Sequence, residues 1–171
     1  MNNSLDLRPR HWCLHLVPHS HSKHVNIVAA NYAAHAPLII LDCGRQYDAS
    51  LVARAAHGRK EIMDRIGIQR AFICSETTRL IQQTPAGKRP VVILDLLSSF
   101  YDENVRMSTR IYLFGRILVH LERLSRGAGL AVIVPPPPSP SDYFLNRLMD
   151  SAPRVLPYHI PPSSSQQLKL F

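Results

Sequence analysis

Residues 11–24, HWCLHLVPHSHSKH, gather five histidines, a cysteine and a lysine in one short stretch. Imidazole nitrogens and thiolate sulfur are ligands that zinc prefers in proteins, so the first chemistry to consider here is metal binding. The histidines are His11, His15, His19, His21 and His24. If residues 11–17 form a strand, Cys13 shares a face with His11 and His15, because successive side chains alternate. No spacing among these residues matches a structural zinc site, so we predict a polar loop without a metal.

A second chemistry for the same stretch is phosphate binding. The histidines and Lys23 would together bind phosphate more strongly at mildly acidic pH, where imidazoles are protonated. A P-loop, the phosphate-binding turn between a strand and a helix, has the form G-x-x-x-x-G-K-[ST]. With Lys23 in the lysine position, Val17 and Ser22 replace the glycines, and His24 replaces the hydroxyl residue. Those glycines let backbone N–H groups wrap the phosphates, so we predict that this loop no longer works as a P-loop.

The flanking residues predict the elements that position this loop. Apolar runs alternate with segments of helical period, which predicts a three-layer α/β/α fold with a mostly parallel central sheet. Strands are expected at 11–17, 37–43, 70–75, 90–97, 130–136 and 154–160. Helices are expected at 25–34, 48–58, 61–67, 77–83, 107–126 and 142–150. Asp48 is expected to cap the second of these helices.

The helix expected over 107–126 has two faces. The apolar face is predicted to join the core and contains Met107, Ile111, Phe114, Ile117, Leu118, Leu121 and Leu124. The opposite face is expected to be solvated and contains Arg110, Arg116, His120, Arg123 and Arg126.

Composition narrows the class of protein. The chain has 171 residues and a formal net charge of +8, which favours nucleic acid or an acidic protein as partner. Its three cysteines are an odd number and lie in apolar runs, so we expect buried thiols in a reducing compartment. No apolar run approaches the length of about 20 residues that spans a membrane. We therefore expect a cytoplasmic protein, associated with the nucleoid or, in a eukaryote, located in the nucleus.

The segment VVILD (91–95) has the form of a Walker B strand, an apolar run ending in the aspartate that helps hold Mg²⁺ in P-loop enzymes. With the order of elements around it, the chain resembles the RecA/RadA recombinase family. There, VVILDLLSSFYDEN would be the Walker B strand and the start of the first DNA-binding loop, and LSRGAGLAVIVPP (124–136) the next core strand. Residues 135–147 would form the second DNA-binding loop, and RLMDSAPRVLPYHI the strand after it. PLIILDCG (37–44) resembles the family strand that ends in Asp-Thr-Glu-Gly.

The resemblance implies a DNA-binding face on these two loops. Arginine pairs with phosphates, and tyrosine can stack on an exposed base. The residues implied are Tyr101, Arg106, Arg110, Tyr143, Arg147 and Arg154. The prolines 135–138 in the second loop fit a rigid, polyproline-like connector equally well.

The resemblance also implies a vestigial nucleotide site, made of Lys23, Asp42 and Asp95. The catalytic glutamate of the family is absent, because Cys43 and Gly44 follow Asp42 directly. We therefore expect no catalytic residue, no cofactor and no metal.

These observations lead to one preferred function and two alternatives. The preferred function is a non-catalytic recombinase paralogue, an accessory protein of DNA recombination or repair. Its expected partners are DNA, single-stranded in preference to duplex and without sequence specificity, and a RecA/RadA-type recombinase or another copy of itself, with no membrane. One alternative is a SulA-like protein-binding regulator on the same fold; the other is a divergent ATP-binding protein that uses Lys23 and Asp95. The RecA-like domain is expected over 1–160, and residues 161–171 are expected to be a loop-like or disordered tail.

Overall fold

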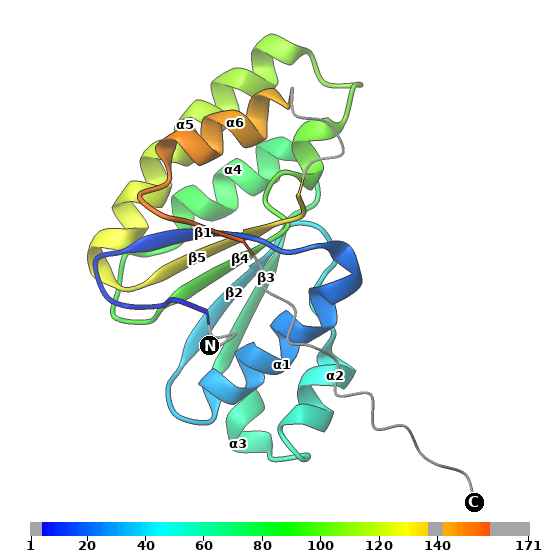
Figure 1. The fold of residues 1–171 in the computed structure, drawn as a ribbon, viewed down its shortest axis with the longest axis vertical. Helices are drawn as coiled ribbons and strands as arrows, with labels where there is room; N and C mark the ends of the chain where they lie inside the picture. Colours follow the sequence, from blue (N-terminus) through cyan, green and yellow to red (C-terminus); the bar gives the residue numbers. More distant parts are fainter. Residues whose placement is uncertain (1–4, 137–141, 158–171) are drawn as a thin grey trace, which may run out of the picture.

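The computed structural model describes residues 5–136 and 142–157, which form a six-stranded sheet with helices on both faces (Figure 1). The strand order is β3-β2-β4-β5-β1-β6, and every strand pairing in the described residues is parallel. The strands are β1 Trp12–Leu16, β2 Leu38–Asp42, β3 Ile66–Arg70, β4 Val91–Leu94, β5 Leu130–Val134 and β6 Val155–Pro157. The predicted three-layer α/β/α fold is confirmed.

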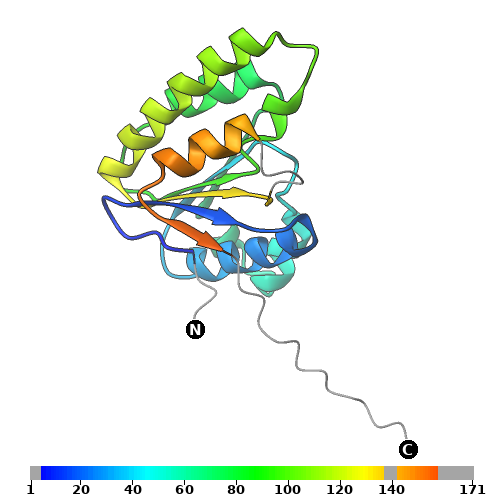
Figure 2. The same cartoon turned by 45° about the horizontal axis from the view of Figure 1, so that its top comes forward.

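The helices form one layer on each side of the sheet. They are α1 Ser22–Ala33, α2 Ala49–Ala55, α3 Lys60–Met63, α4 Cys74–Gln83, α5 Met107–Gly127 and α6 Tyr143–Ser151, with 3-10 turns η1 His19–His21 and η2 Ser98–Tyr101. Helices α1 to α3 cover one face, and α4 to α6 cover the other (Figures 1 and 2). Each layer has its own apolar core, so β4 and β5 are buried on both faces, as the continuous apolar runs predict.

Local sequence signals fix several helix ends. The Asp48 carboxylate accepts a hydrogen bond from the Leu51 N–H at 3.0 Å and caps α2. Asp142 does the same for α6 through the Leu145 N–H, also at 3.0 Å. The chain leaves α2 through Gly58, whose φ of +69° is a conformation that glycine adopts without strain.

The strand predicted at 70–75 is wrong. Strand β3 occupies Ile66–Arg70 instead, and α4 already begins at Cys74. The apolar residues Phe72 and Ile73, which suggested a buried strand, are 38% and 50% exposed. Because β3 is an edge strand with several exposed residues, its own sequence IGIQR lacks the continuous apolar signal of a central strand. The helix expected over 61–67 ends earlier, at Met63, because β3 already begins at Ile66.

The arginine face of α5 is not the solvated stripe that was expected. The Arg123 guanidinium donates to the carbonyl oxygens of Ile81, Gln82 and Thr84, at 3.0, 3.2 and 2.8 Å. Arg116 donates to the Gln82 side chain at 2.9 Å. These bonds satisfy carbonyls at the C-terminal end of α4, so this part of the stripe ties α4 to α5. On the apolar face, the described core takes Phe114, Ile117, Leu121 and Leu124, whereas Met107 and Ile111 are exposed.

No helix in the described part of the chain is both long enough and apolar enough to cross a membrane.

Candidate functional site at the carboxyl edge of the sheet

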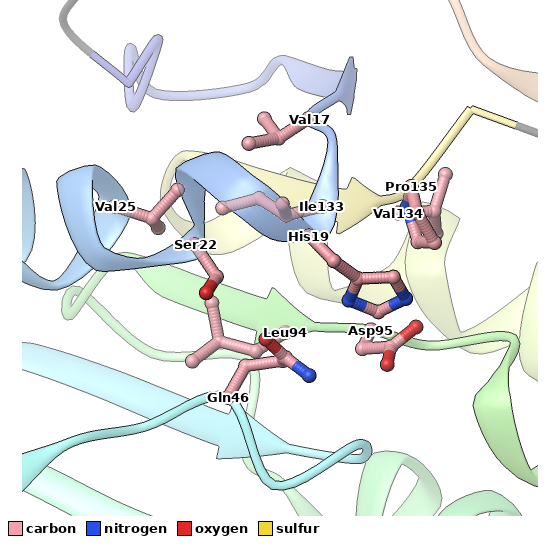
Figure 3. A pocket seen from close by; sticks show the side chains of 10 residues that line it. All are labelled: Val17, His19, Ser22, Val25, Gln46, Leu94, Asp95, Ile133, Val134 and Pro135. Atoms are coloured by element: carbon pink, nitrogen blue, oxygen red, sulfur yellow. The ribbon is translucent and has the colours of Figure 1, made fainter.

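In open α/β sheets, ligands bind outside the carboxyl ends of the strands. In this protein, the strand arrows of Figure 2 point toward that edge. A half-open pocket lies there, with a volume of about 310 Å³ counted to its open mouth. Ten residues line it: Val17, His19, Ser22, Val25, Gln46, Leu94, Asp95, Ile133, Val134 and Pro135 (Figure 3). The polar groups that converge on it are therefore a carboxyl, an imidazole, a hydroxyl and an amide.

Asp95 has the only carboxyl group among the side chains of these ten lining residues. It directly follows β4, has a left-handed φ of 54° and is 7% exposed. Figure 3 shows the His19 ring next to its carboxyl group. Burial raises the pKa of Asp95, the nearby His19 lowers it, and the Asp42 carboxylate raises it further. On the other side, a Cβ atom added to Gly44 would lie 2.1 Å from Asp95 Oδ2. Asp95 therefore lies between the Gly44 backbone on one side and the His19 ring on the other.

The raised pKa of Asp95 predicts that Asp95→Asn stabilises the protein at neutral pH. The folded state ionises this carboxyl less readily than the unfolded chain, so the carboxylate costs stability above its folded pKa. Asparagine removes that cost and tolerates the left-handed conformation. We expect a gain on the order of 1 kcal/mol at pH 7 that disappears as the pH falls through the folded pKa.

Urea unfolding of the wild type and the variant at several pH values measures this gain. The exposed carboxyl of Asp64 gives the control, since Asp64→Asn should change little at any pH. A destabilised Asp95→Asn at pH 7 would show that the ionised carboxylate is needed for the fold.

The loop between β1 and α1 differs from a phosphate-binding loop in its geometry. Pro18 starts a 3-10 turn in which the His21 N–H donates to the Pro18 carbonyl at 2.8 Å. Because the His21 N–H is bonded within the loop, it is not available to a phosphate. The loop also has no glycine. Lys23 is exposed on α1 and does not line the pocket, whereas Ser22 does. This segment therefore contributes His19 and Ser22 to the pocket, but not Lys23, and His19 is the side chain next to the Asp95 carboxyl.

Asp42 organises the loop after β2. Its side chain is 0% exposed, and its Oδ1 accepts from the N–H groups of Gln46 at 2.9 Å and Gly44 at 3.4 Å. Its Oδ2 accepts from the Tyr47 N–H at 3.2 Å and from Arg70 Nε at 3.3 Å. Three of these four donors are backbone N–H groups of the loop over 43–47, so Asp42 holds this loop in place.

The structure brings together two of the six residues implied in DNA binding, Tyr101 and Tyr143, which both pack on Phe144. Tyr101, Arg106, Tyr143 and Arg147 are all exposed, on η2, at the start of α5 and on α6. The Tyr101 hydroxyl donates to the Asp142 carboxylate, which joins η2 to the start of α6. Burial and this bond to Asp142 raise the pKa of Tyr101.

Arg110 and Arg154 are both engaged within the protein. Arg110 donates to the Phe100 carbonyl at 2.9 Å, with its guanidinium 6.0 Å from the Phe144 ring centre. Arg154 precedes β6 at the amino edge of the sheet and forms an ion pair with Asp6 at 3.1 Å. Arg154 therefore lies at the opposite edge from Tyr101.

A buried aromatic cluster supports the two exposed tyrosines. Phe100, Phe114 and Phe144 contact one another with ring centres 5.3 to 5.5 Å apart. Tyr143 and Tyr101 both pack on Phe144, at 5.3 and 6.4 Å, with their rings nearly perpendicular to it. Rigid support of this kind limits the conformational entropy that the tyrosines lose on binding.

The histidine-rich segment does not form a metal centre in the described residues, where no group of three or more His, Cys, Asp or Glu side chains has a suitable arrangement. Cys13 and His15 are buried, whereas His11 is exposed. The Cys13 thiol contacts the Asp6 carboxylate at 3.6 Å, and burial raises its pKa to about 11. Burial likewise raises the pKa of Cys43, so neither thiol is activated as a nucleophile.

His15 predicts an acid-sensitive fold. Burial lowers the pKa of His15 to about 4, and its Nε2 has no hydrogen-bond partner in the described part of the chain. A histidine with a depressed pKa contributes stability above its ordinary pKa of about 6.5, and this is lost as the pH falls toward the folded pKa. At pH 4.5 we expect the wild type to have lost about 2–3 kcal/mol through this residue.

Comparison of the wild type with His15→Leu isolates this contribution. The free energy of unfolding of the variant should fall less between pH 7.5 and pH 4.5. His11→Leu is the control, because His11 is exposed on the same strand segment. Equal losses in wild type and His15→Leu would contradict the assignment.

The fold is similar to that in a crystal structure of the RadB recombinase, with a TM-score of 0.67. The superposition covers 88% of this chain and 75% of the RadB chain. The chain has a RecA-like fold. Sequence identity over the superposition is 15%, so the likeness concerns the fold alone. No protein-family model matches the chain, and no curated protein matches its sequence.

Sequence reasoning missed several residues of this RecA-like edge. It did not place Ser22 or Gln46 in the pocket, because side chains from different elements meet there only after folding. It also missed Arg45 and Phe72, whose guanidinium and ring contact at 4.9 Å. The usable signal for these two was the run of polar and aromatic residues directly after β2 and β3.

Proposed function

We propose that this protein is a non-catalytic accessory protein of DNA recombination or repair, which binds single-stranded DNA at the carboxyl edge of its RecA-like fold. The observation that carries the proposal is the pair of exposed tyrosines, Tyr101 and Tyr143, packed on Phe144. The arginines that would accompany them are Arg106, just before α5, and Arg147 on α6, both exposed. Aromatic rings supply stacking surfaces for bases, and arginines supply charge for phosphates. Because stacking needs unpaired bases, single strands are the preferred ligand. A recombinase or a second copy of the chain is the protein partner that we expect beside DNA.

The absence of ATP hydrolysis is part of the proposal. It is supported by the 3-10 turn in place of a glycine loop and by the position of Lys23, which is not among the residues that line the pocket. Incubation with ATP–Mg²⁺ should release no phosphate above background. Saturable ATP binding that Lys23→Ala removes would instead favour the divergent ATP-binding protein.

The direct test is fluorescence anisotropy with labelled single-stranded and double-stranded oligonucleotides at two salt concentrations, with and without ATP–Mg²⁺. We expect micromolar or tighter binding to single strands that weakens with salt and ignores ATP. Arg106→Ala and Arg147→Ala should each weaken it, and Arg54→Ala, on the exposed surface of α2, is the matched control. No binding at low salt, despite the +8 charge, would overturn the proposal.

One observation favours the SulA-like protein-binding regulator as second candidate. Helix α5 exposes Tyr112 and Val119 by 64% and 68%, and the two side chains share a face because they are seven residues apart. Exposed apolar side chains in such an arrangement are typical of protein interfaces. This candidate predicts indifference to DNA and a protein interaction that Val119→Asp abolishes.

A further inference from the structure

The loops after β2 and β3 carry two arginine–aromatic pairs side by side. The Arg45 guanidinium lies over the Phe72 ring at 4.9 Å, and the Arg70 guanidinium lies over the Tyr47 ring at 5.7 Å. Strands β2 and β3 are neighbours in register, with Asp42 beside Arg70, so both pairs are held at the same carboxyl edge.

A buried carboxylate holds the backbone and one arginine of this arrangement in place. Asp42, which is fully buried, holds both the Tyr47 N–H and Arg70 Nε. Arg45 sits in the same loop with a left-handed φ of 58°, a conformation that costs energy for a residue other than glycine. The loop therefore sets the backbone position of Arg45, and Asp42 holds the Arg70 guanidinium directly.

The pair of Arg45 and Phe72 is available to a ligand. Phe72 is 38% exposed and is followed by Ile73, which is 50% exposed. Among the described residues, no carboxylate forms an ion pair with Arg45, whereas Arg70 is already paired with Asp42. An apolar ring next to an uncompensated guanidinium presents both a stacking surface and a phosphate-binding charge.

The surface is continuous with the proposed DNA-binding cluster. Gly44, next to Arg45, packs directly against Asp95, which leads into η2 and Tyr101. From the other side, the Thr77 hydroxyl in α4 lies 3.2 Å from the Ser99 hydroxyl in η2. Phe72 and Tyr101 thus follow the carboxyl ends of two strands, β3 and β4, that have only β2 between them.

We propose that Arg45 and Phe72 form a second stacking platform for single-stranded nucleic acid, in which Phe72 stacks on a base and Arg45 contacts the adjacent phosphate. The inference rests on the proposed function and extends the strand's path from η2 across the ends of β4, β2 and β3. Base stacking on an aromatic ring depends little on base identity, so this platform is expected to be sequence-tolerant. The positive charge of the chain and the uncompensated Arg45 favour nucleic acid over an acidic polypeptide.

The first test uses the Phe72→Trp variant and follows its fluorescence during titration with an oligothymidine. The chain has one other tryptophan, Trp12, which is buried and gives a constant background. Stacking of a base on the introduced indole ring should quench the emission and leave affinity unchanged. An oligonucleotide of abasic sites, which offers phosphates without bases, should not quench it.

The second test measures affinity for the same single strand by anisotropy. Phe72→Ala and Arg45→Ala should each raise Kd about five-fold or more, the usual range for loss of one stacked base. Met63→Ala and Arg54→Ala, exposed apolar and basic residues outside this edge, should leave Kd unchanged. Thermal unfolding of each variant checks that the fold is kept.

The outcomes separate the two proposals. Suppose that the wild type binds the oligonucleotide and that Arg106→Ala weakens binding but Phe72→Ala does not. The proposed platform of Arg45 and Phe72 is then wrong, and the proposed function stands. If the wild type binds no oligonucleotide, both are wrong. If poly-glutamate quenches the Phe72→Trp variant and the oligothymidine does not, the surface binds acidic protein, and the platform is again overturned.

Discussion

Replacing Asp42 by alanine is expected to lower the free energy of unfolding by about 2–4 kcal/mol, because three backbone N–H groups lose their acceptor. The change removes the acceptor for the backbone N–H groups of Gln46 and Tyr47 and leaves them without a partner in a half-buried loop. It also releases Arg70. Urea unfolding followed by circular dichroism measures the loss.

Two variants calibrate this result. Asp42→Asn keeps one oxygen acceptor but loses the charge, so it should cost less than alanine. Asp48→Ala removes a helix cap a few residues away and should cost about 1 kcal/mol. If Asp42→Ala costs no more than Asp48→Ala, Asp42 does not anchor the loop as described.

The loss of Asp42 should also affect the surface that we propose for nucleic-acid binding. Arg45 and Tyr47 take their positions from the loop that Asp42 holds. In Asp42→Asn, which keeps most of the fold, affinity for single strands should therefore fall, although Asp42 itself is buried and carries a charge that repels phosphate.

Gly44→Ala is expected to be the most damaging substitution of a small residue at the carboxyl edge. The added Cβ would lie 2.1 Å from Asp95 Oδ2 and 2.5 Å from Asp95 Cβ. Such distances require the loop or the start of η2 to move. Overpacking of this kind costs about 3 kcal/mol or more when backbone must shift.

A second substitution at Asp95 should relieve the clash. Asp95→Gly removes each of the three nearest atoms that the new Cβ would meet, and glycine suits the φ of 54°. The double variant should be more stable than the sum of its parts by about 2 kcal/mol in a double-mutant cycle. Gly115→Ala is the matched control: nothing lies within 4 Å of its added Cβ, and in helix α5 it should stabilise by about 1 kcal/mol. Additive effects of Gly44→Ala and Asp95→Gly would contradict the contact.

The central part of the fold could be predicted from the sequence because its signals are local. Strands β4 and β5 are unbroken apolar runs, and the helix caps Asp48 and Asp142 stand at the ends of helical patterns. The edge strand β3 could not be placed in the same way. It is half exposed, and the more apolar residues after it, Phe72 and Ile73, belong to a loop on the surface.

The roles of the arginines could not be predicted, because they depend on distant residues. Arg123 bonds to carbonyls some 40 positions earlier, and Arg154 pairs with Asp6 across almost the whole chain. Helical periodicity shows which face an arginine occupies but not which element packs on it. The same limit applies to Asp42, whose position at a strand end suggested a nucleotide site and whose partners are backbone N–H groups of the next loop.

The place of β1 between β5 and β6 has a consequence for the order of folding. Trp12 lies opposite Leu130, and Leu14 lies opposite Val155. Strand β1 therefore cannot pair with a neighbouring strand until β5 and β6 have been synthesised. Strands β2, β3 and β4 can pair during synthesis, but β1 remains an unpaired apolar segment until most of the chain has left the ribosome. Non-local closure of this kind slows folding and exposes apolar strands meanwhile. Removal of β5 and β6 by a late stop codon would therefore leave β1 without a place in the sheet, and the truncated product would aggregate.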